Sequence, residues 1–114
     1  MSCPDTDYDF ITELTDAIDR ESVVKIDCAI NNLKKNRNID INKQNDDGDT
    51  ALTLAARYKE GVGIIEFLCD TFKDTIDINK QDNDGNTVLM LAVHYRKGFK
   101  IIQYLCDMFK DKID

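Results

Sequence analysis

The sequence repeats itself with a period of 37 residues. Residues 39–77 align without a gap on residues 76–114, and 24 of the 39 aligned pairs are identical. A repeat unit of this length cannot bury its apolar surface alone, so repeated units of this kind stack on one another. The period therefore restricts the fold to a stack of similar units, and equivalent residues are expected to occupy equivalent places.

Each copy of the repeat contains two helical patterns. In both copies apolar residues recur at helical spacing directly after a threonine, and Thr50 and Thr87 have the chemistry of helix N-caps. Gly61 and Gly98 are predicted to end these short first helices. The predicted second helices lie at about residues 63–72 and 100–109. The repeat unit is thus predicted to be a pair of helices.

Turn-forming residues separate the predicted helix pairs. Residues 45–49 and 82–86 combine Asp and Asn with one glycine each, Gly48 and Gly85, which is typical of tight turns with positive φ. We expect these segments to be finger loops that join one pair to the next. Upstream, apolar residues at helical spacing predict a third, divergent pair within residues 7–38. The other face of its first helix is acidic, as expected of a terminal repeat that faces water.

The whole chain of 114 residues is predicted to be one domain with an all-α fold. Three stacked helix pairs would form a solenoid with finger loops along one side. The predicted divisions are an N-terminal capping repeat at 7–38, repeats at 39–75 and 76–112, and the start of a further finger at 113–114.

Charge and composition exclude several classes of partner. Asp and Glu number 22 against 15 Lys and Arg, which gives a formal net charge of −7. Because an acidic surface repels phosphate backbones and anionic membranes, we expect no nucleic-acid or membrane partner. No apolar run approaches the roughly 18 residues that span a bilayer, and the N-terminus does not read as a secretory signal. Four cysteines without CxxC spacing favour a reducing, cytoplasmic location.

Neither a metal site nor a catalytic site is expected. Residues 82–86 alternate carboxylate and amide oxygens like a calcium loop, but with Gly85 at the sixth position Lys80 and Leu91 would stand at two ligand positions. His94 is the one histidine of the chain, and no nucleophile stands at a suitable spacing from it. We therefore expect no enzyme activity and no cofactor.

The repeats resemble ankyrin repeats. Residues 82–92 read D-x-x-G-x-T-x-L-x-x-A and residues 77–79 read D-I-N, close to the start and the end of the ankyrin pattern. The histidine of that pattern is replaced by Thr53 and Met90, so the helix starts are expected to rely on threonine caps alone. A composition rich in Ile, Asn, Lys and Asp also resembles ankyrin arrays of large DNA viruses and AT-rich protists, which would imply a host cytoplasm for a viral protein.

The resemblance implies a protein–protein interaction module that binds along a concave strip of short helices and acidic finger loops. The acidity predicts a basic or mixed patch on the partner. Tyr58 and Tyr95, repeated and expected to be exposed, are predicted anchors. The full set of implied contact residues is Gln44, Asp46, Asp47, Asp49, Arg57, Tyr58, Gln81, Asn83, Asp84, Asn86, His94 and Tyr95.

Three alternatives stay open at this point. The loop residues are good turn formers and need have no other role than to form solvated turns. The chain is alternatively a structural or self-associating segment of a longer array, joined through an apolar C-terminal helix pair. In that case some side chains of the pair should be exposed, among Phe99, Ile102, Leu105 and Met108. The resemblance further implies asparaginyl hydroxylation at Asn42 or Asn79.

Overall fold

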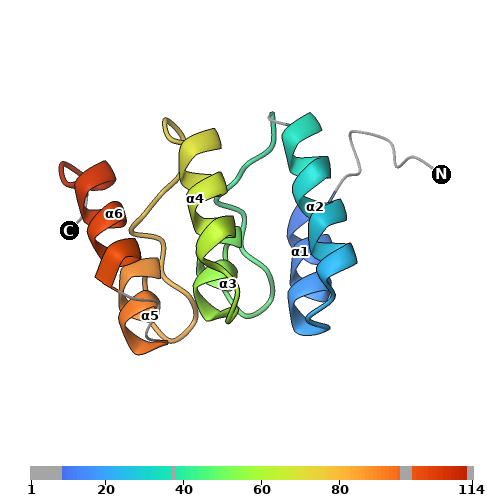
Figure 1. The fold of residues 1–114 in the computed structure, drawn as a ribbon, viewed down its shortest axis with the longest axis horizontal. Coiled ribbons are helices and arrows are strands. Elements are labelled where there is room, and N and C mark those ends of the chain that lie inside the picture. The colour runs from blue at the N-terminus through green and yellow to red at the C-terminus, as the bar shows by residue number, and fades with distance from the viewer. Residues whose placement is uncertain (1–8, 37, 96–98, 113–114) are drawn as a thin grey trace.

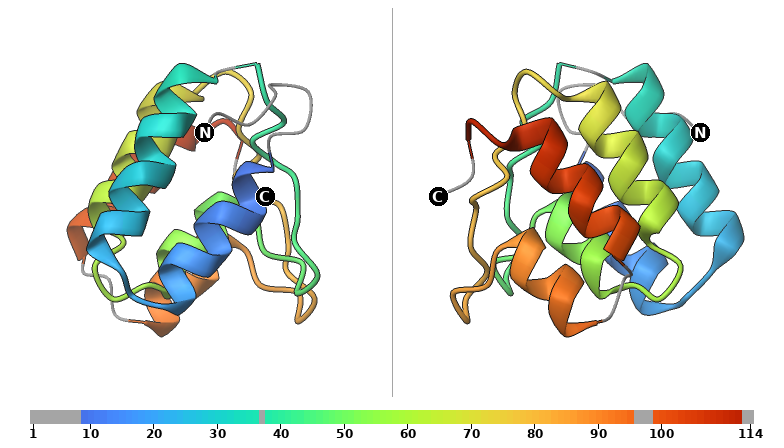
Figure 2. Two further views of the ribbon diagram at one scale, coloured as in Figure 1. Left: turned by 90° about the vertical axis from the view of Figure 1, so that its right-hand side faces the viewer. Right: turned by 60° about the vertical axis from the view of Figure 1, so that its left-hand side comes forward.

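The computed structural model describes residues 9–36, 38–95 and 99–112. These residues form six helices and no strands: α1 (Phe10–Asp19), α2 (Val23–Lys35), α3 (Ala51–Arg57), α4 (Val62–Thr71), α5 (Val88–His94) and α6 (Phe99–Phe109). The helices stand side by side as three pairs (Figure 1). Figure 2 shows α2, α4 and α6 as an outer layer and α1, α3 and α5 as an inner layer, with the finger loops beyond it. The predicted all-α stack of helix pairs is confirmed.

Threonine caps begin the short helices of the inner layer. The Thr50 hydroxyl accepts a hydrogen bond from the Thr53 backbone N–H at 3.2 Å, and the Thr87 hydroxyl accepts one from Met90 at 3.4 Å. In α3 the Thr53 hydroxyl also accepts from the Thr50 N–H at 2.8 Å, which completes a capping box. The prediction of threonine caps acting alone is therefore wrong for α3, because Thr53 supplies a second bond that Met90 has no oxygen to make.

Gly61 begins a helix and does not end one. The first helix of that repeat stops at Arg57, and Gly61 is the N-cap of α4. The predicted helix end is wrong because Tyr58 has already left the helix with extended backbone, at ψ 133°. A Cβ at position 61 would lie 1.7 Å from the Ala55 carbonyl oxygen, so close packing against α3 requires glycine there. Gly98, predicted to end the equivalent helix, lies outside the described residues.

One continuous apolar core runs through all three helix pairs. Phe10 of α1 and Phe109 of α6, at opposite ends of the stack, belong to the same buried cluster. At the C-terminal end of the stack, Phe99 is 77% exposed, whereas Leu105 is fully buried. Ile102 and Met108 are half-buried. The prediction that some side chains of this pair are exposed is confirmed for Phe99.

The described cysteines Cys28, Cys69 and Cys106 are free thiols. Cys69 lies in the core, where a cysteine packs as a small apolar residue. Burial, and next to it the charge of Asp70, raises the pKa of the Cys69 thiol to about 12, so this thiol stays protonated at neutral pH.

Candidate partner-binding surface

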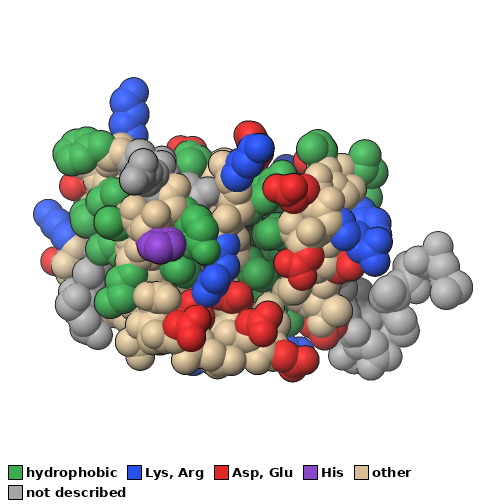
Figure 3. All heavy atoms as spheres, turned by 90° about the horizontal axis from the view of Figure 1, so that it is seen from below, with side chains coloured by type: hydrophobic (Ala, Val, Ile, Leu, Met, Phe, Trp, Pro, Cys, Tyr) green, Lys and Arg blue, Asp and Glu red, His purple; other side chains and the backbone are tan. Residues whose placement is uncertain are grey.

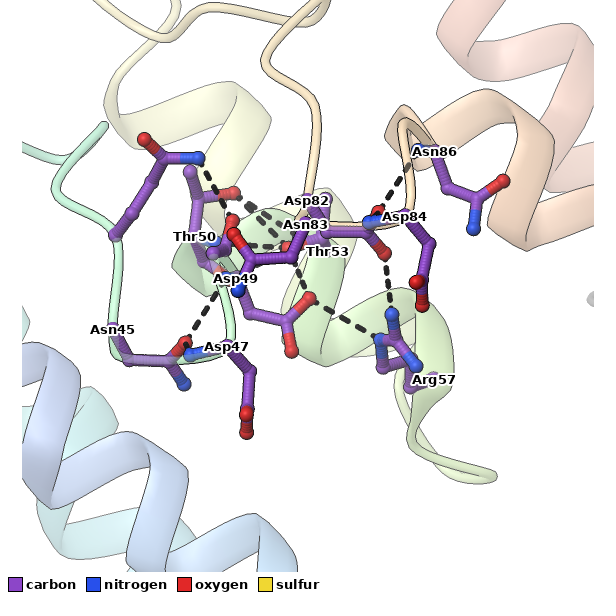
Figure 4. A network of polar contacts seen from close by, with 12 residues as sticks. Asn45, Asp47, Asp49, Thr50, Thr53, Arg57, Asp82, Asn83, Asp84 and Asn86 are labelled. Atoms are coloured by element: carbon purple, nitrogen blue, oxygen red, sulfur yellow. Dashed lines mark hydrogen bonds and ion pairs between the residues drawn. The ribbon is translucent and has the colours of Figure 1, made fainter.

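An acceptor side chain at the start of each finger loop organises the turn. The Asn45 Oδ1 accepts from the backbone N–H groups two and four residues later, at 3.0 and 2.9 Å. The Asp82 Oδ1 makes the same pair of bonds, at 2.9 Å each (Figure 4). Gly48 and Gly85 then take positive φ, 79° and 84°. The predicted glycine turns are confirmed, and the two loops share one conformation.

Hydrogen bonds also join one finger loop to the next. The Gln44 Nε2 donates to the Gln81 carbonyl oxygen at 2.8 Å, and the Asn83 Nδ2 donates to the Asp46 carbonyl oxygen at 3.1 Å. The backbone N–H of Asn83 donates to the Asp47 carbonyl oxygen at 3.3 Å. These bonds cross the repeat boundary, so the loops form one ordered edge.

Arg57 bridges two buried carboxylates from successive repeats. Its Nε lies 3.2 Å from Asp49 Oδ1, and its Nη2 pairs with Asp82 Oδ2 (Figure 4). Asp49 and Asp82 are only 5% and 6% exposed. The Thr53 hydroxyl donates a further bond to Asp49 at 3.1 Å. Arg57 thus ties the end of α3 to both finger loops.

The surroundings shift the pKa values of these two carboxyls in opposite directions. Burial, with the charge of Asp82 added to it, raises the pKa of Asp49 more than Arg57 and Thr53 lower it. Burial also acts to raise the pKa of Asp82, but the backbone N–H groups of Asn86 and Asp84 and the Arg57 guanidinium outweigh it and hold that pKa below its usual value. Asp82 is therefore the carboxyl whose charge favours the folded chain.

Tyr58 is buried, so its prediction as an exposed anchor is wrong. It is 8% exposed and belongs to the core cluster, whereas Tyr95 is 42% exposed. The two residues leave their helices differently, at ψ 133° and 10°, so the chain that follows each tyrosine takes a different direction. Tyr95 packs edge-on against His94 with ring centroids 4.8 Å apart. Asp49 is likewise turned inward, because Arg57 and Thr53 hold its carboxylate.

The other predicted contact residues lie on the finger loops and at the ends of α3 and α5. Arg57 and Asn86 are half-buried. The exposed ones are Gln44, Asp46, Asp47, Gln81, Asn83, Asp84, His94 and Tyr95. Most of the predicted surface is therefore accessible, except at Asp49 and Tyr58.

A hollow of about 410 Å³ lies between α1 and the first finger loop. We call it the acidic hollow, because the charged residues that line it are five aspartates, Asp9, Asp16, Asp19, Asp46 and Asp47, and one lysine, Lys43. Sequence reasoning placed Asp46 and Asp47 at the surface for binding but missed the α1 residues. The sequence did contain a signal for these α1 residues, namely the acidic face of the first predicted helix. That face was interpreted only as the water-facing side of a terminal repeat.

Some charge in the acidic hollow is neutralised locally. Asp16 pairs with Arg20 at 2.7 Å and with Lys25 at 3.4 Å, and the hydrogen bond from Arg20 lowers the Asp16 pKa. Lys43 Nζ lies 3.8 Å from Asp9 Oδ1. Within the described residues no ion pair reaches Asp19, Asp46 or Asp47. These three carboxylates carry the negative charge that remains available to a partner.

The two asparagines considered for hydroxylation act as links between repeats. The Asn42 Nδ2 donates to the Thr75 carbonyl oxygen at 2.9 Å, and its Oδ1 accepts from the Asp77 N–H at 2.7 Å. The Asn79 Nδ2 donates to the Lys112 carbonyl oxygen at 2.5 Å. Both side chains thus hold the chain segments that enter the finger loops.

Within the parts of the chain that the structure describes, no three His, Cys, Asp or Glu side chains are grouped as metal ligands. In the segment that resembles a calcium loop, Asp82 directs one oxygen to two backbone N–H groups and the other to Arg57.

None of the described helices has the length and apolar character needed to cross a bilayer.

A family model for ankyrin repeats, in three copies, matches residues 21–114. The match includes both 37-residue copies and begins just before α2. No curated protein and no solved structure matches the chain. The matched span, the paired helices and the finger loops agree with one another, and the chain belongs to the ankyrin repeat family.

Proposed function

We propose that this chain binds another protein through its inner helices and finger loops, and that the acidic hollow attracts a basic or mixed patch on that partner. Ankyrin repeats are generally protein–protein interaction modules and are typically not enzymes. The implied contact residues on the second finger loop and at the end of α5 extend this surface toward the last repeat, with Asp84 and Tyr95 as exposed members.

The observation that carries the proposal is an exposed negative charge on loops that are already ordered. Asp46 and Asp47 stand on a finger loop whose backbone is bonded to the next one. Figure 3 shows acidic side chains along the side of the molecule where the finger loops lie. An ordered loop loses little conformational entropy on binding, and complementary charge speeds encounter with a basic partner.

Neutralising the acidic hollow should weaken binding of basic peptides about tenfold. A display library of random peptides, each about 12 residues long, should yield Lys- and Arg-rich sequences when it is selected on the chain. The Kd of the selected peptides, measured by fluorescence anisotropy, should be about tenfold higher for the triple variant Asp19→Asn, Asp46→Asn, Asp47→Asn. These three aspartates make no ion pair within the described residues, so their replacement removes charge without breaking a salt bridge there.

The control for this experiment makes the same change in net charge elsewhere. It replaces exposed aspartates far from the hollow, Asp74, Asp107 and Asp111, with asparagine. Peptide affinity should change less than about twofold in this control. An equal loss in the two triple variants would mean that only net charge matters, and it would rule out the hollow as the site.

A second candidate function, self-association, is favoured by the C-terminal face of the stack. In α3, Thr53 and Ala56 are buried, whereas the equivalent Met90 and Val93 of α5 are exposed, as is Phe99 at the start of α6. A second copy of the chain would cover these side chains. Light scattering should then show a dimer that Phe99→Lys converts to a monomer. A monomer at every concentration would contradict this candidate.

A further inference from the structure

The outer layer of the stack is joined differently at its two boundaries. Between α4 and α6, the Tyr104 hydroxyl donates to Asp70 Oδ1 at 2.9 Å. The residue 37 positions before Tyr104 is Phe67, which has no hydroxyl to make such a bond. The Lys34 ammonium instead lies 5.7 Å from the centroid of the Phe67 ring. The boundary between α2 and α4 thus lacks this direct hydrogen bond.

At this boundary a groove of about 540 Å³ lies between α2 and α4. Figure 3 shows apolar side chains exposed between the α1–α2 pair and the α3–α4 pair. Val23, on the α2 side, is 66% exposed. We call this feature the outer groove; its apolar lining consists of Val23, Ile26, Ile30, Tyr58, Ile64 and Phe67.

Gly63 keeps one wall of the outer groove free of a side chain. It lines the groove on α4, and a Cβ built there would meet no atom within 4 Å. The equivalent residue of α6 is Lys100. Glycine inside a helix costs about 0.5–1 kcal/mol relative to alanine. No contact requires a glycine at this place, unlike at Gly61, and its effect is to leave space for an occupant.

The charged residues that line the outer groove have one sign, and Lys34 lies outside this lining, over the Phe67 ring. Of the described residues that line the groove, Asp27 of α2 and Glu60 before α4 are charged, and both are acidic and exposed. An apolar groove with acidic side chains at its border is complementary to a surface that combines apolar and basic residues. A second copy of this acidic chain offers less complementarity than a basic partner does.

We propose that the outer groove docks an amphipathic helix of a partner protein. Apolar side chains on one face of that helix, spaced i, i+3 or i+4, and i+7, enter the groove between α2 and α4. Lys or Arg residues beside them meet Asp27 and Glu60. The groove belongs to the outer layer and the acidic hollow to the inner one, so this docking is independent of the function proposed above.

A labelled model helix tests the proposal on the whole chain. The probe is a fluorescein-labelled peptide of about 18 residues, with a leucine stripe at helical spacing flanked by lysines, and the reference is its scrambled sequence. We expect a Kd on the order of 10 μM for the probe, and a Kd at least about tenfold higher for the scrambled peptide.

Gly63→Gln should raise the probe's Kd about tenfold, because its side chain fills the groove. The matched control, Lys100→Gln, places the same side chain at the equivalent position of α6 and should change the Kd less than about twofold. Since nothing stands near a Cβ at position 63 and Gln is a better helix former than Gly, Gly63→Gln should stay folded with an equal or higher urea midpoint.

Charge and location complete the test. The double variant Asp27→Asn, Glu60→Gln should raise the probe's Kd about fivefold and reduce its dependence on salt. Amide NMR shifts on titration should change in α2 and α4. Equal binding of the scrambled peptide, no effect of Gly63→Gln, or shifts confined to α1 and the finger loops would overturn the proposal. The proposal would also be overturned if the chain formed a dimer and Gly63→Gln dissociated it, because the occupant of the groove would then be a second copy of the chain.

Discussion

Replacing Gly48 with alanine should lower the free energy of unfolding by about 3 kcal/mol or more, whereas Gly85→Ala should cost about 1 kcal/mol. Both glycines have positive φ, so alanine is strained at either position. Their surroundings differ. A Cβ at position 48 would lie 2.4 Å from Asn83 Oδ1 and 2.6 Å from the Asn83 backbone nitrogen, but a Cβ at position 85 would meet nothing within 4 Å. Alanine at position 48 must therefore push the two finger loops apart.

Urea denaturation followed by circular dichroism measures both glycine variants, and Gly85→Ala is the internal control for backbone strain alone. The free energy of unfolding that Gly48→Ala loses beyond the loss in Gly85→Ala measures the contact between successive loops. This contact includes the hydrogen bonds from Asn83 to Asp46 and Asp47. Equal losses in the two variants would show that the contact contributes no stability.

Asp82→Asn should lower the free energy of unfolding by about 2 kcal/mol at neutral pH, and Asp82→Ala by about 3–4 kcal/mol. Asn45 shows that an amide oxygen can organise the same turn, so asparagine at position 82 keeps the turn and removes only the charge that faces Arg57. Alanine removes both. Asp49→Asn, which reproduces Asn86 of the later copy, is the matched control and should change stability by less than about 1 kcal/mol.

The loss in Asp82→Asn should depend on pH. Because the folded chain lowers the Asp82 pKa below the usual 3.8, the stability from its ionised form is present above that value and is lost as the pH falls through the lower folded-state pKa. The difference between wild type and Asp82→Asn should therefore shrink from about pH 7 to about pH 2. The pKa of Asp49 is raised in the folded chain, so the contribution of Asp49 to stability changes with pH in the opposite direction, and its protonation favours the fold at low pH. If the difference in the free energy of unfolding between wild type and Asp82→Asn stayed constant down to the lowest pH, the role given to Asp82 would be contradicted.

The repeat period and the apolar spacing predicted the helix pairs well. The second helices, predicted at about 63–72 and 100–109, begin within one residue of the observed starts of α4 and α6. The threonine caps and glycine turns were also predictable, because such features depend on residues two to four positions apart in the sequence. The end of α3 was not, since it depends on how Gly61 packs against Ala55.

Burial at the candidate site could not be predicted from the repeat alone. Tyr58 and Tyr95 are identical residues at equivalent positions, yet one is buried and the other exposed, because the two repeats have different neighbours. The link between Arg57 and Asp82 joins residues 25 positions apart. No local pattern shows that these two side chains meet between repeats, or that α1 supplies part of the acidic hollow.

The hydrogen bonds that join the finger loops use backbone groups of several exposed residues, so the side chains of these residues can be substituted without losing the bonds. Asp46 and Asp47 accept from Asn83 through their backbone carbonyl oxygens, and Asp84 donates to Asp82 through its backbone N–H. Every residue supplies the same carbonyl, and every residue but proline the same N–H. Substitutions at these three positions can therefore alter what the surface recognises while the loops keep their shape. A new binding preference could evolve, or be engineered, one residue at a time, as long as the residues that organise the loops are retained.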